Sequence, residues 1–116
     1  MQIRGIRGAT TVKNNNKEEI LEATRELLSE IVKNNQIKVD DIASIVFSAT
    51  EDVDADFPAA AARELGWKDT PLLCTREINV PGSLPKCIRI LMLVNSEKPQ
   101  KDIKNVYLKD AVKLRR

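Results

Sequence analysis

The chain has 116 residues, of which 42% are hydrophobic, so it is long enough for one domain with a modest core. Nineteen Lys and Arg residues against 17 Asp and Glu residues give a formal net charge of +2, which does not favour a nucleic-acid or membrane partner. Histidine is absent from the sequence, which removes the usual general base near neutral pH and the commonest metal ligand. The two cysteines, Cys74 and Cys87, match neither a zinc spacing nor a disulfide framework.

The first expected element is a strand over residues 1–12, where side chains alternate loosely and two glycines thin the strand. Asn16 and Glu19 then have the spacing of a helix capping box. Isoleucine, leucine and threonine recur with a 3.6-residue period over 20–31, with charged residues between them. This pattern predicts an amphipathic helix that ends at the asparagines of 34–35.

One short helix and four more strands are expected after this first helix. The helix is predicted over 57–66, because that segment has a proline near its start, a run of alanines and a terminal glycine. The strands are predicted at 42–49, 72–78, 86–95 and 105–108. The order βαβαβββ predicts a single α/β domain over 1–116 with a mixed sheet.

The segment 86–95, KCIRILMLVN, is apolar on both faces, which is typical of a buried strand, yet it contains Arg89. A guanidinium keeps its proton and is costly to bury without an anion beside it. Arg89 therefore either extends from a strand end to solvent, pairs with a carboxylate of the fold, or binds an anionic ligand. Arg7 either lies exposed at a sheet edge or binds an anionic ligand. Arg63 is either a solvated charge on the short helix or a ligand-binding residue.

Taken together, the arginines suggest a ligand. Arg7, Arg89 and Arg63 can converge on a small molecule with two carboxylates, with Glu77 available to accept a hydrogen bond from a hydroxyl group. From the residues alone, the sequence predicts a binding site for a small polyanion without histidine or metal chemistry.

Several segments resemble one enzyme family, in order along almost the whole chain. They are MQIRGIRGATTV, FSAT followed by DFPAAAARELGW, CTREINVPG, LPKCIRILMLVN and VYLKDAVKLR. Together they resemble the monofunctional chorismate mutases of the trimeric α/β-barrel class. The resemblance implies a mixed five-stranded sheet packed on helices, and three such subunits in a pseudo-α/β-barrel homotrimer with active sites between neighbours. It also implies the rearrangement of chorismate to prephenate in phenylalanine and tyrosine biosynthesis, without a cofactor.

The resemblance also implies roles for individual residues. Arg89 would face the ether oxygen of chorismate, Arg7 and Tyr107 would bind a carboxylate, and Glu77 would accept a hydrogen bond from the ring hydroxyl. The other implied substrate-binding residues are Cys74 beside Glu77, Leu72 and Leu73 on the wall, Phe57 and Arg63 from the adjacent subunit, and Leu114 and Arg115 from the C-terminal tail.

Two other classes of function are alternatives to the enzyme. A non-catalytic trimeric module that binds a small anion on a similar barrel would need an arginine, but not both Arg7 and Arg89 with Glu77. A nucleic-acid binder fits less well, because the net charge is small and the sparse aromatics form no stacking platform. The opening residues lack a signal-peptide pattern and no apolar run approaches a membrane span, so a cytoplasmic protein is expected.

Overall fold

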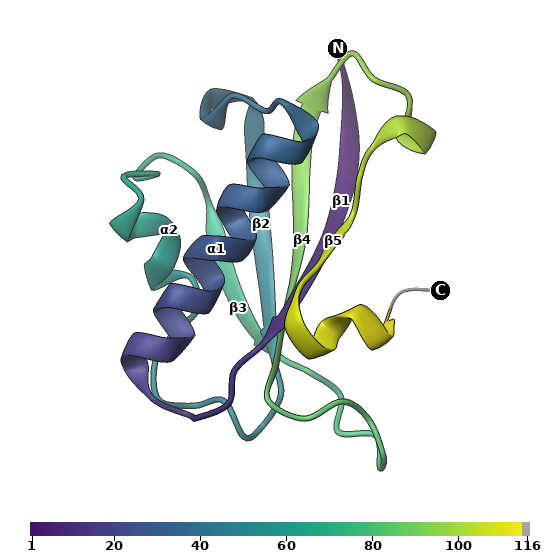
Figure 1. Ribbon diagram of the computed structural model, residues 1–116. Helices are drawn as coiled ribbons and strands as arrows, with labels where there is room; N and C mark the ends of the chain where they lie inside the picture. The colour runs from purple at the N-terminus through teal and green to yellow at the C-terminus, as the bar shows by residue number, and fades with distance from the viewer. Residues whose placement is uncertain (115–116) are drawn as a thin grey trace.

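A five-stranded mixed sheet organises the computed structural model, which describes residues 1–114 (Figure 1). Its strands are β1 (Gln2–Thr11), β2 (Ile42–Ala49), β3 (Leu72–Arg76), β4 (Cys87–Ser96) and β5 (Val106–Tyr107), in the spatial order β3-β2-β4-β1-β5. Strand β4 is antiparallel to both β1 and β2, whereas β3 is parallel to β2 and β5 is parallel to β1. The predicted α/β class, strand order along the chain and mixed sheet are confirmed.

Two α-helices cover one face of this sheet (Figure 1). The helices are α1 (Lys17–Asn35) and α2 (Ala60–Glu64), and three 3-10 helices are η1 (Val39–Asp41), η2 (Gln100–Asp102) and η3 (Lys109–Leu114). Helix α2 is shorter than predicted, because residues 57–59 form a turn in which the amides of Ala60 and Ala61 bond three residues back, to Phe57 and Pro58. The 3-10 helices were not predicted, since such short segments carry no 3.6-residue periodicity.

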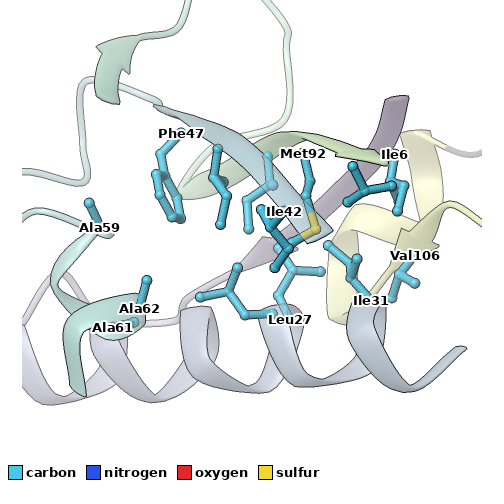
Figure 2. Packing of buried hydrophobic residues seen from close by; sticks show 14 of the residues in the cluster. Ile6, Leu27, Ile31, Ile42, Phe47, Ala59, Ala61, Ala62, Met92 and Val106 are labelled. Atoms are coloured by element: carbon cyan, nitrogen blue, oxygen red, sulfur yellow. The ribbon is translucent and has the colours of Figure 1, made fainter. Parts of the chain in front are cut away.

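The core between helices and sheet is mostly aliphatic (Figure 2). Leu27 and Ile31 of α1 pack against Ile6 and Met92 of the sheet, and all four side chains are fully buried. Phe47 is the largest fully buried side chain. Ala61 and Ala62 of α2 are also buried in this cluster, and their small side chains suit close packing of a short helix.

The N-terminus of α1 is capped as the sequence predicts, with one difference. The side chain of Asn16 accepts a hydrogen bond from the Glu19 amide at 2.8 Å. The Glu19 carboxylate does not return a bond to Asn16 but accepts from the amides of Lys13 and Asn14. These backbone bonds hold the pKa of Glu19 below its usual range, because they favour the charged form. These bonds therefore stabilise the fold fully above the ordinary carboxyl pKa. The stabilisation is lost as the pH falls through the lowered pKa of Glu19.

Gly8 of β1 allows α1 to lie close to the sheet. A Cβ atom at this position would lie 2.7 Å from Cδ1 of Ile31 and 3.2 Å from Cδ1 of Leu27. We expect Gly8→Ala to lower the free energy of unfolding by about 1–3 kcal/mol, because the packed core must shift to accept the methyl group. Urea denaturation of both proteins measures the difference.

Gly5→Ala is the matched control, on the same strand but the opposite face. Its Cβ would lie 3.8 Å from Leu91 and 3.9 Å from Leu93, which is ordinary contact. This substitution is expected to be neutral or to stabilise by up to about 1 kcal/mol. If the Gly8→Ala protein were as stable as the Gly5→Ala protein, α1 could move away from β1 without lowering the free energy of unfolding.

The face of the sheet away from the helices is largely uncovered. Ile3, Leu73 and Leu91 lie on this face and are 61%, 59% and 44% exposed. Only one end is covered, where Ala111 of η3 packs on Ala9 and Cys87. The interpretation of residues 86–95 as a strand buried on both faces is therefore wrong for the single chain, because beyond Cys87 only the helix-facing side of β4 is enclosed. In the part of the chain that the structure describes, no helix is long and apolar enough to cross a membrane.

Candidate active site

The uncovered face contains a cleft of about 920 Å³ that brings Arg7 and Arg89 together. In the β1–β4 register Arg7 lies opposite Leu91, and Arg89 lies opposite Ala9. The two arginines are therefore diagonal neighbours on one face, with backbones about 7–8 Å apart. The cleft is lined by Arg7, Gly8, Ala9, Asn34, Val46, Ser48, Arg89, Ile90, Leu91, Lys104, Asn105, Tyr107 and Leu114.

Arg89 is paired with Glu77 rather than isolated in the core. Its Nε atom lies 3.0 Å from Oε2 of Glu77, and the two side chains are 41% and 26% exposed. The N–H of this buried Nε is not aligned for a hydrogen bond to any residue in 1–114, so the contact with Glu77 is an attraction between charges. The alternative of a carboxylate partner within the fold is therefore confirmed, and the cleft leaves part of the Arg89 side chain accessible.

Glu77 is held at the end of β3 by several contacts. Its amide donates to the carbonyl of Ala49 at 2.9 Å, which extends the β2–β3 pairing by one residue. Oε1 accepts from the amide of Ile78 at 3.2 Å, and Oε2 accepts from the hydroxyl of Ser48 at 3.2 Å. The sequence did not single out Ser48. The alternation of the predicted strand puts Ser48 on the same face as Val46, which was the only sign in the sequence of where its hydroxyl points. The strand register is needed to show that Ser48 lies opposite Arg89 and reaches Glu77.

Side-chain amides place Tyr107 and Arg7 at the cleft. The Arg7 amide donates to Oδ1 of Asn105 at 2.9 Å, next to the short β5 pairing with Gly8 and Ala9. The buried Asn35 at the end of α1 bonds both the carbonyl and the amide of Lys104, at 2.9 and 2.8 Å. The end of α1 therefore fixes the segment that carries Tyr107. The sequence predicted Asn35 only as a helix stop.

Cys87 is unsuited to act as a nucleophile. It is 1% exposed, in the small cluster with Ala9 and Ala111 of η3. Burial raises the pKa of its thiol, so the reactive thiolate is disfavoured at neutral pH. Across residues 1–114 no three or more metal-ligating side chains gather in one place.

The other predicted site residues are divided between the two faces. Cys74 does not line the cleft but lines a separate hollow of about 380 Å³, together with Phe57. Leu72 packs against the main core instead of the cleft wall. The reason is the alternation of β3, which directs Leu72 and Cys74 toward the helices and Leu73 toward the uncovered face.

The remaining predicted residues lie around these two hollows. Leu114 lines the main cleft. Leu73 is exposed on the same face, outside the residues that line the cleft. Arg63 is exposed on α2, on the helix-covered side of the sheet, and its side chain has no hydrogen bond or ion pair with residues 1–114. Arg115 lies outside the described residues.

The cleft has the chemistry of an anion site. Two guanidinium groups and a phenol, from Arg7, Arg89 and Tyr107, face it from neighbouring strands, and Glu77 lies in contact with Arg89. Such groups can bind carboxylates in a defined orientation and stabilise negative charge that develops between them. The sequence has no histidine, the usual general base near neutral pH.

Comparisons with known proteins agree with this chemistry. Residues 3–116 match the family model described as Chorismate mutase type I. Chorismate mutase AroH of Bacillus subtilis (strain 168) is 49% identical over 116 residues, covering 99% of this chain and 91% of that protein. Chorismate mutase AroH of Thermus thermophilus is 48% identical over 114 residues, covering 97% of this chain and 93% of that protein.

Solved structures support the same assignment. The chorismate mutase from Clostridium thermocellum (Cth-682) superposes with a TM-score of 0.92 at 55% sequence identity, covering 93% of this chain and 96% of that chain. Sequence, fold and cleft chemistry therefore lead to one conclusion, that the chain belongs to the type I chorismate mutase family.

Proposed function

We propose that the cleft around Arg7 and Arg89 is the site at which this chorismate mutase rearranges chorismate to prephenate, a step toward phenylalanine and tyrosine. The observation that carries the proposal is the pair of arginines on adjacent strands, facing one cleft with Glu77 in contact with Arg89. Chorismate is a dicarboxylate with a ring hydroxyl and a breaking ether bond, so it offers a partner to each of these groups.

The rearrangement needs orientation more than reactive groups. It is pericyclic, so no nucleophile, proton transfer or cofactor takes part, which suits a site without histidine. Arg7 and Tyr107 bind the carboxylate of the side chain, and Glu77 accepts a hydrogen bond from the ring hydroxyl. These contacts hold a flexible substrate in the compact shape that reacts, and so remove much of the entropic part of the barrier.

Arg89 supplies the electrostatic part of catalysis. Its guanidinium lies against the ether oxygen, which gains negative charge as the carbon–oxygen bond breaks. The interaction is stronger in the transition state than in the bound substrate, and only such a difference raises kcat. Glu77 holds Arg89 in place by charge attraction before the substrate arrives.

We further propose that the active form is a homotrimer with sites between subunits. The sheet face that carries the cleft exposes Ile3, Leu73 and Leu91, and a neighbouring subunit would cover this apolar surface. Phe57 is 68% exposed and lines the separate hollow with Cys74, and Arg63 is exposed on α2. A cyclic assembly in which the helix-side hollow of one subunit meets the cleft of the next would bring Phe57, Arg63 and Cys74 to the site.

The first test is turnover of chorismate by the purified protein. We expect the absorbance of chorismate to fall and prephenate to form, in buffer with a metal chelator and no added cofactor. An intact oligomer that binds chorismate without converting it would contradict the proposal and favour the small-anion-binding module.

A further inference from the structure

Ser48 lies beside both Arg89 and Glu77. It sits on β2 directly opposite Arg89 of β4, and it lines the cleft. Its hydroxyl donates to Oε2 of Glu77 at 3.2 Å, and that same oxygen lies 3.0 Å from Nε of Arg89. Ser48 is thus the third member of a cluster in which one carboxylate oxygen is shared by a hydroxyl and a guanidinium.

Ser48 differs from the other contacts of Glu77 because it fixes the carboxylate from another strand. The Nε–H of Arg89 is not aligned for a hydrogen bond, so Arg89 attracts the carboxylate without fixing its direction. The Ile78 amide fixes Oε1 from the adjacent residue of the same chain segment. Within residues 1–114, Ser48 is the only side chain that hydrogen-bonds to the Glu77 carboxylate.

We propose that Ser48 is a positioning residue, which holds the Glu77 carboxylate between β2 and β4 so that Arg89 is anchored toward the ether oxygen. This inference rests on the proposed function of the cleft. When the hydroxyl is removed, the Glu77 carboxylate keeps the Ile78 bond at Oε1 but loses its hydrogen bond at Oε2, so Arg89 loses a fixed counter-charge. Because the transition state demands a more exact placement of Arg89 than binding does, the loss falls mainly on kcat rather than on KM.

The test compares three substitutions on β2. Ser48→Ala is expected to lower kcat by about 10-fold or more with a change in KM below about 3-fold, on the scale of one hydrogen bond to a charged group. Ser48→Thr keeps the hydroxyl on a residue that suits a strand, so it is expected to restore most of kcat. Ser44→Ala is the matched control, because Ser44 shares the strand and the face but its hydroxyl bonds to no residue in 1–114.

A double-substitution cycle shows whether Ser48 acts through Glu77. If it does, Ser48→Ala causes little further loss in a Glu77→Ala protein. An additive loss, or a failure of Ser48→Thr to restore kcat, would contradict the positioning role. An active unsubstituted protein whose kcat is unchanged by Ser48→Ala would refute the role of Ser48 alone, whereas an inactive unsubstituted protein would refute the proposed function itself.

Discussion

Arg89→Ala is expected to lower kcat by about 10²–10³-fold, the scale of losing one preorganised donor to a developing oxyanion. The proposed role of Arg89 is to stabilise charge that exists only in the transition state, so its loss affects kcat more than substrate binding. Arg7 remains in the same cleft to bind a carboxylate. Steady-state kinetics with chorismate separate the two parameters.

The fold is expected to tolerate Arg89→Ala. The ion pair with Glu77 is partly exposed, with side chains 41% and 26% accessible, and such pairs contribute little to stability. Glu77 also keeps its bonds to Ser48 and Ile78. The melting temperature and the oligomeric state should therefore change little.

Two further variants make the result specific to Arg89. Arg89→Lys keeps the charge but not the planar fork, so an intermediate loss of kcat is expected. Arg4→Ala removes an arginine of β1 that bonds Lys98 and Gln2 outside the cleft, and it should leave kcat unchanged. An Arg89→Ala protein with nearly normal kcat would mean that Arg89 does not act on the transition state.

The elements of the fold are largely predictable from local patterns. The 3.6-residue stripe over 20–31 gives α1, and the apolar run 42–49 coincides with β2. The patterns fail where the physical signal is weak, as at η3, which is too short to show a period. They also cannot give the order β3-β2-β4-β1-β5, because strand neighbours are decided by contacts between distant segments.

The sequence likewise predicts only part of the candidate site, because contacts between distant segments decide the rest. Arg7, Arg89 and Glu77 could be named because charged residues at apolar or small-residue positions stand out. Ser48 and Asn35 could not, since a serine in a strand and an asparagine at a helix end have ordinary explanations. Their roles depend on register and on contacts across the sheet, which a single sequence does not contain.

The uncovered sheet face is where the apolar pattern of β4 bears on the proposed homotrimer. Strand β4 is apolar on both sides, but the helices of one chain cover only one of them. If the proposed neighbouring subunit covers this face, it buries the second apolar side of residues 86–95. The same cover would enclose Arg89 and exclude water from the cleft, which strengthens its electrostatic effect.

Mixing two inactive proteins should restore activity if the sites are shared between subunits. Arg7→Ala and Arg63→Ala are each expected to lose most activity, Arg7 from the cleft and Arg63 from the neighbour that completes it. After subunit exchange in equal amounts, an interface is intact when an Arg63→Ala subunit supplies Arg7 and an Arg7→Ala subunit supplies Arg63. Random exchange around a cyclic trimer makes about one quarter of the interfaces intact, so activity should recover to about that fraction.

A second mixture provides the control that decides the interpretation. Arg7 and Arg89 line the same cleft of one chain, so every interface formed from Arg7→Ala and Arg89→Ala subunits lacks one of them. No recovery is expected from that mixture, although the subunits exchange equally well. Recovery there would contradict the joint action of the two arginines in one site. A failure of the Arg7→Ala and Arg63→Ala mixture, with exchange verified by two affinity tags, would mean that Arg63 acts within its own chain or through stability, and that each subunit carries its own complete site.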